Sequence, residues 1–70
     1  MLLKLIVQVP ALNEAPRIDG VISAVPRRIV GVDEVEILIV DDGSSDGTSD
    51  VARAAGANHL LRFPHNRGLS

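Results

Sequence analysis

The fold of this chain follows from residues 37–48, which read Ile37-Leu38-Ile39-Val40-Asp41-Asp42-Gly43-Ser44-Ser45-Asp46-Gly47-Thr48. The apolar residues at its start are mostly β-branched and predict a buried strand. Two carboxylates follow, and then a glycine-rich polar turn that predicts a helix start. Fold stability alone rarely calls for two carboxylates at the end of a buried strand, because their desolvation is costly. The stretch therefore predicts a ligand-binding edge of a sheet.

Length and composition limit what surrounds this edge. The chain has 70 residues, which is at most one small domain, and it has no cysteine and one aromatic residue, Phe63. An aliphatic core of this kind suits parallel strands covered by helices. The net charge of -2 gives no support for nucleic-acid binding. No apolar run approaches the roughly 20 residues that span a bilayer, and the N-terminus is interpreted as a strand rather than a signal peptide.

The remaining patterns predict the order β-α-β-α-β, an α/β fold. The predicted strands are residues 3–9, ended by Pro10, then 35–40 and 58–63. The predicted helices are residues 16–25, with the apolar core positions Ile18, Val21, Ile22 and Val25, and 47–55, with Asp46 as N-cap. Residues 64–68 are expected to form a turn that leads into another helix.

One face of such a sheet should lack a cover. Right-handed crossovers between strands that step in one direction place both helices on the same face. Yet Leu38 and Val40 point away from Val35, Ile37 and Ile39, so both faces of that strand are apolar. The chain is therefore predicted to be half of a sheet, able to self-associate through its exposed face and edge.

The loops 10–14 and 41–48 follow parallel strands and should meet at one edge of the sheet. Because adjacent side chains of a strand diverge, we expect Asp42 to face the site and Asp41 to be structural. Other loop types fit less well. With Gly47 at the sixth position of an EF-hand, Arg53 stands where the final glutamate belongs, and neither a P-loop nor a dinucleotide-binding pattern occurs.

Three motifs in order resemble the beginning of a family 2 glycosyltransferase with the GT-A fold, closest to the dolichol- or polyprenyl-phosphate sugar transferases. They are residues 9–14 (Val-Pro-Ala-Leu-Asn-Glu), residues 40–48 and residues 66–70 (Asn-Arg-Gly-Leu-Ser). The resemblance implies that residues 1–70 are the N-terminal nucleotide-binding portion of a single glycosyltransferase domain. They would form the β-α-β-α-β parallel half of the Rossmann-like GT-A fold, with the remainder of the domain absent.

The resemblance also implies a site for the nucleotide of a UDP- or GDP-linked sugar. Position 12 is often aromatic in the family, where the ring packs on the base. Leu12 would replace that stacking by a plain apolar contact, so the resemblance does not decide between uridine and guanosine. By this resemblance the residues around base and ribose are Pro10, Ala11, Leu12, Glu14 and Asp42, with Gly68 near the nucleotide.

The resemblance assigns no catalytic residue and no metal ligand to this chain, since the family's Asp-x-Asp motif and catalytic base lie downstream. A divalent cation, Mg²⁺ or Mn²⁺, is expected for the full enzyme, because the leaving diphosphate needs neutralisation. We therefore expect no transfer by these 70 residues alone. The implied acceptor is a polyprenyl phosphate or a similar molecule, and the implied location is the cytoplasm or the cytoplasmic face of a membrane.

A second reading is a response-regulator receiver domain, in which Asp41 and Asp42 would bind magnesium. A complete strand-helix unit precedes the acidic pair here, whereas a receiver would begin with that strand.

His59, His65 and the pair Arg27-Arg28 are interpreted as ordinary surface residues. Arg62 and Arg67 lie within reach of a diphosphate, but solvation is the expected role of both.

Overall fold

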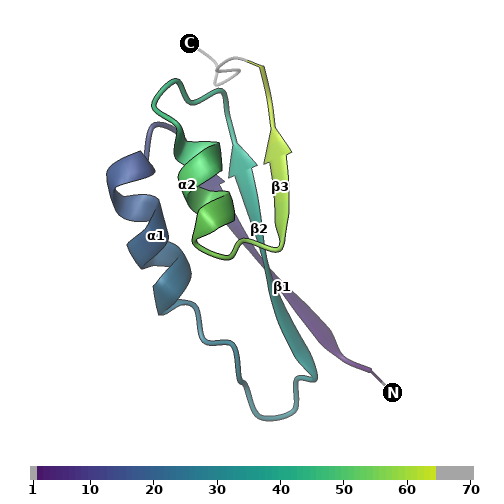
Figure 1. Cartoon of the computed structure of the whole chain (residues 1–70). Helices are drawn as coiled ribbons and strands as arrows, with labels where there is room; N and C mark the ends of the chain where they lie inside the picture. Colours follow the sequence, from purple (N-terminus) through teal and green to yellow (C-terminus); the bar gives the residue numbers. More distant parts are fainter. Residues whose placement is uncertain (1, 65–70) are drawn as a thin grey trace.

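The computed structural model describes residues 2–64 and confirms the α/β order (Figure 1). The strands are β1 (Lys4–Ala11), β2 (Glu34–Asp41) and β3 (His59–Arg62). The helices are α1 (Ala15–Ala24) and α2 (Thr48–Ala54). None of the helices among the described residues is long and apolar enough to cross a membrane.

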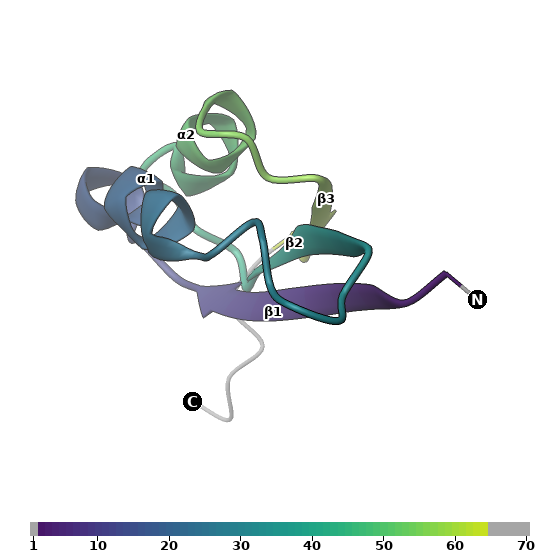
Figure 2. The ribbon, with the colours of Figure 1, turned by 90° about the horizontal axis from the view of Figure 1, so that it is seen from below.

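The sheet has the order β1-β2-β3, and all its strands are parallel. Figure 2 shows both helices on one side of the sheet, as the right-handed crossovers predict. The carboxyl ends of the strands, and the loops that follow β1 and β2, therefore lie at one edge, at the top of Figure 1.

The core lies between the sheet and the two helices. Alternate residues of β2, including Ile37 and Ile39, are fully buried there. Ile18 and Ile22 of α1 are buried against them, as predicted, but the prediction for Val21 is wrong, because it is 44% exposed. The packed stripe of α1 is narrow because nothing among residues 2–64 covers the flank that carries Val21.

β1 does not stop before Pro10 but continues to Ala11, with Pro10 opposite Val40. The carbonyl oxygens of Leu3 and Ala11 both accept hydrogen bonds from the β2 side, from the N–H groups of Asp33 (2.8 Å) and Asp42 (3.0 Å). Odd-numbered residues of β1 thus direct their backbone groups toward β2, and the nitrogen of Pro10 faces the outer edge. A proline is tolerated there because no ladder bond is lost.

The face of the sheet opposite the helices, called the open face below, bears no helix in residues 2–64 (Figure 2). Its lower part is ionic. Nζ of Lys4 lies 3.6 Å from a carboxylate oxygen of Glu34 and 3.6 Å from one of Glu36. Nε2 of His59 lies 2.7 Å from the same oxygen of Glu36. The hydrogen bond from His59 lowers the pKa of Glu36, with a smaller contribution from Lys4. Self-association through this face stays a prediction.

Arg27 is exposed, as the sequence predicts, but it also makes hydrogen bonds that the sequence does not reveal. Its guanidinium donates to the carbonyl oxygens of Val35 (3.2 Å) and Gly56 (3.0 Å) and to Oδ1 of Asn58 (3.0 Å). These bonds join the segment after α1 to the loop between α2 and β3. Arg27 therefore cross-links the end of the sheet that lies opposite the loops after β1 and β2.

Candidate nucleotide-binding site

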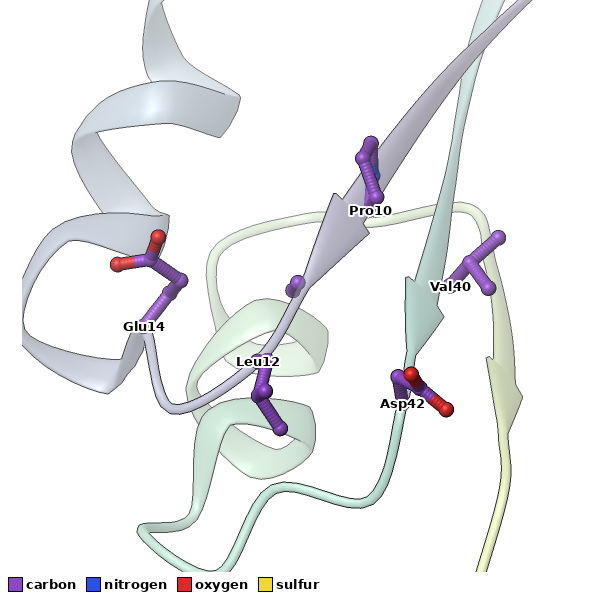
Figure 3. A pocket seen from close by; sticks show the side chains of 6 residues that line it. Pro10, Leu12, Glu14, Val40 and Asp42 are labelled. Carbon is purple, nitrogen blue, oxygen red and sulfur yellow. The ribbon is translucent and has the colours of Figure 1, made fainter. Parts of the chain in front are cut away.

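A cavity of about 400 Å³ lies at the carboxyl edge of the sheet, between the loops that follow β1 and β2 (Figure 3). It brings together every predicted site residue that the structure describes, and Gly68 lies outside the described residues. Their role in binding stays a prediction. The residues that line the cavity are Pro10, Ala11, Leu12, Glu14, Val40 and Asp42.

Val40 is the lining residue that the sequence reasoning missed. It stands opposite Pro10 in the parallel register, so the two side chains share a face of the sheet. Asp42 comes two residues after Val40 and follows the same alternation. That face is the open face, so the cavity lies where the open face meets the carboxyl edge. The register of the strands would have been needed to find Val40.

The cavity combines apolar and anionic surface. Pro10, Leu12 and Val40 supply aliphatic contact, and Glu14 and Asp42 supply carboxylates (Figure 3). The carboxylate of Glu14 accepts hydrogen bonds from Nε (2.9 Å) and Nη2 of Arg17, one helical turn later. Carboxylates beside an apolar wall can accept N–H and O–H donors from a flat, partly apolar ligand.

Asp41 points the other way and is fully buried, at 0% exposure. Its carboxylate accepts hydrogen bonds from the N–H of Ser44 (2.9 Å) and the hydroxyl of Ser49. Burial alone would raise the pKa of Asp41, but these bonds and the charge of Arg62 outweigh it, so the pKa lies below its usual value. The expectation that Asp41 is structural and Asp42 faces the site agrees with this geometry.

Arg62 is not merely solvated, as the sequence suggested. Nη1 lies 3.7 Å from Asp41 and 3.3 Å from Oγ of Ser49, and Nη2 donates to the carbonyl oxygen of Ser44 at 2.8 Å. Arg62 balances the buried carboxylate and holds the turn after β2. Sequence alone does not reveal this, because the pairing needs β3 in register beside β2.

Side chains of the second loop hold the backbone of the first loop. The N–H groups of Asn13, Glu14 and Ala15 donate to Oγ of Ser44 (2.8 Å), Oγ1 of Thr48 (2.9 Å) and Oδ2 of Asp46 (3.1 Å). In return, Oδ1 of Asn13 accepts the N–H of Ser45 at 2.9 Å. The two loops are therefore one bonded unit.

The prediction that Asp46 is the N-cap of α2 is wrong by one position, although its side chain still bonds the start of that helix. The residue at the N-cap position of α2 is Gly47, with φ 83°, and Asp46 precedes it. One carboxylate oxygen of Asp46 accepts the N–H of Thr48 (3.1 Å), and the other accepts the N–H of Ala15 in the first turn of α1. The hydrogen bond from the Thr48 side chain lowers the pKa of Asp46. One carboxylate thus serves the starts of both helices.

No three His, Cys, Asp or Glu side chains come together as metal ligands within residues 2–64. Asp41 is the buried acid that residues 2–64 place next to the cavity, and both of its carboxylate oxygens already accept hydrogen bonds from Ser44 and Ser49. These residues do not fit a divalent cation.

The sequence comparison decides the family. Residues 6–70 match the family model described as Glycosyl transferase family 2. This chain belongs to glycosyl transferase family 2. The receiver-domain reading is therefore wrong. In that reading both carboxylates would bind one magnesium ion, whereas Asp41 is fully buried and Asp42 lines the cavity. The three parallel strands and two helices are part of the Rossmann-like GT-A fold of this family of enzymes.

Two curated relatives are similar to this family 2 chain. The "Succinoglycan biosynthesis protein ExoU" of Rhizobium meliloti (strain 1021) is 37% identical over 54 residues, 71% of this chain. The "Glycosyltransferase AglE" of Haloferax volcanii is 40% identical over 45 residues, 64% of this chain. The alignments span only 16% and 15% of those proteins' own lengths. No solved structure gives a significant match.

Proposed function

We propose that this chain is the nucleoside-binding portion of a glycosyltransferase domain that uses a nucleotide-diphosphate sugar as donor. The observation that carries the proposal is the cavity between the two loops, in which Leu12, Pro10 and Val40 lie beside the carboxylates of Glu14 and Asp42. A nucleoside complements both kinds of surface, because it has an apolar ring face and a set of N–H and O–H donors.

In this proposal Asp42 accepts hydrogen bonds from a ring N–H of the base or from the ribose hydroxyls. Glu14 lies across the cavity, where it accepts from the ribose. Leu12 and Pro10 make the apolar contact with base and ribose, and Gly68 lies near the nucleotide. Uracil offers one ring N–H and guanine offers two adjacent donors, so either base provides a partner for Asp42. The donor is accordingly a UDP- or GDP-linked sugar.

For the whole protein we propose transfer of the sugar to a polyprenyl phosphate or a similar acceptor, in the cytoplasm or at the cytoplasmic face of a membrane. Mg²⁺ or Mn²⁺ would neutralise the leaving diphosphate. Its ligands and the catalytic base would be provided by residues outside this chain. The 70-residue chain alone is expected to hold the nucleoside and to transfer nothing.

Titration of ¹⁵N-labelled chain with UDP, GDP or inorganic pyrophosphate, followed by NMR, tests the nucleoside proposal. We expect UDP or GDP to shift the amide signals of Leu12, Glu14 and Asp42, which line the cavity. Pyrophosphate should leave these signals in place, because the proposed contacts are to base and ribose. Equal shifts with pyrophosphate, or nucleotide shifts confined to the opposite end around Val30, would contradict the proposal.

A further inference from the structure

We propose that Thr48, Ser44 and Asn13 are positioning residues for the nucleoside cavity, in that they fix the backbone that presents Leu12 and Glu14. This inference rests on the proposed function. None of the three lines the cavity. Each of them takes part in a hydrogen bond that joins the loop after β1 to the loop after β2.

The geometry of the first loop shows why it needs such support. Asn13 stands between Leu12 and Glu14 and has φ 53°, in the left-handed region that residues other than glycine rarely adopt. Its N–H is held by Oγ of Ser44, and its side-chain oxygen holds the N–H of Ser45. This conformation turns the chain sharply between the two cavity residues. Without these bonds the loop would have little reason to keep that turn.

Thr48 extends the same control to Glu14. The Thr48 hydroxyl accepts the N–H of Glu14 and donates to Oδ1 of Asp46, whose other oxygen accepts the N–H of Ala15. Thr48 is fully buried, so its hydroxyl cannot exchange these partners for water. The hydroxyl therefore sets the peptide plane from which the Glu14 side chain projects. The same hydroxyl also bonds Oδ1 of Asp46, which accepts the N–H of Thr48, so one side chain links Glu14 of the first loop to the start of α2.

The test compares Thr48→Val with Thr48→Ser. Valine keeps the volume and removes the hydroxyl, whereas serine keeps the hydroxyl. The dissociation constants for UDP and GDP are measured by NMR titration of the chain, together with the hydrogen exchange of the Glu14 amide. We expect Thr48→Val to weaken binding about tenfold, the equivalent of one lost hydrogen bond, and to speed Glu14 exchange. Thr48→Ser should restore both.

Ser49→Ala is the matched control. Ser49 is buried like Thr48 and lies next to it, but its hydroxyl bonds Asp41 and not the first loop. It should lower stability and leave the nucleotide affinity of the folded chain unchanged, and it should speed Glu14 exchange no more than it speeds exchange of the buried β2 amides, which open with the whole fold. A purely structural role of Thr48 would make Thr48→Val behave in the same way, and that result would overturn the inference.

Asn13→Gly provides a second variant should Thr48→Val fail to fold. Glycine keeps the left-handed conformation and removes the acceptor for the Ser45 N–H. We expect weaker nucleotide binding, and unchanged affinity would overturn the inference. Unchanged Glu14 exchange in a folded Thr48→Val chain would also overturn it while leaving the proposed function standing. A wild-type chain that binds neither UDP nor GDP would refute the proposed function and the positioning role together.

Discussion

Replacing Asp41 with asparagine should destabilise the fold far more than the same replacement at the adjacent Asp42. Asp41 is fully buried and accepts from Ser44 and Ser49, with Arg62 at 3.7 Å. Asparagine keeps one acceptor oxygen for the N–H of Ser44, but it removes the charge that Arg62 balances and turns an NH₂ group toward the guanidinium, which cannot accept a hydrogen bond. Losing a hydrogen bond to a buried charge and leaving a donor without a partner costs about 2–4 kcal/mol.

The size of that loss matters because the chain is small. A core of this size rarely provides more than about 3–5 kcal/mol, so Asp41→Asn should remove most of the free energy of unfolding. In urea unfolding followed by far-UV circular dichroism, with a slope of about 1 kcal/mol/M, the midpoint should fall by at least about 2 M. The measurement is repeated over a range of chain concentrations, because self-association would raise the midpoint.

Asp42→Asn is the control for this experiment. Asp42 lines the cavity and is only half-buried, and asparagine keeps its volume and one acceptor oxygen. Its midpoint should stay within about 0.5 kcal/mol of wild type when expressed as free energy. Equal midpoints for the two variants would refute the reasoning that the acidic pair divides into a folding residue and a site residue.

Three further predictions concern pH, Arg27 and the open face. Because the folded pKa of Asp41 is lowered, its contribution to stability is complete above the ordinary aspartate value of about 4 and is lost as pH falls through the lower folded pKa. The urea midpoint should therefore drop in acid, and a drop of equal size in Asp41→Asn would contradict this. Arg27→Lys should cost about 1–2 kcal/mol because a lysine cannot reach three acceptors, while Arg28→Lys on the exposed loop should be neutral in the same unfolding assay. Sedimentation should show concentration-dependent association that Leu61→Lys on the open face reduces and Val30→Lys on a distant loop does not, and a cooperatively unfolding monomer would argue against it.

The alternation of side chains along a strand was enough to predict the local part of the site. It separated Asp42 from Asp41, and it placed the loops after β1 and β2 at one edge, where the structure finds the cavity. These inferences need only the period of a strand and the parallel direction of its neighbour. The same period explains the buried side of β2 and the open face opposite the helices.

The long-range contacts were not predictable in this way. Arg27, Asp46 and Arg62 each looked like a local or solvated residue in the sequence, yet their partners lie up to 31 positions away along the chain. Such contacts depend on which strands are neighbours and on their register. Pro10 predicts a strand end because proline cannot donate to a sheet ladder, yet β1 continues through it, since β1 is an edge strand and the nitrogen of Pro10 faces outward.

The most direct test of the nucleoside site is the dissociation constant of UDP and GDP for the wild-type chain, Asp42→Asn and Asp50→Asn. Asp50 is a matched control because the same charge is removed from an exposed position on α2, away from the cavity. We predict measurable binding of one or both nucleotides, weakened at least about tenfold in Asp42→Asn and unchanged in Asp50→Asn. Equal affinity of all three chains would contradict the assignment of Asp42 to the nucleoside.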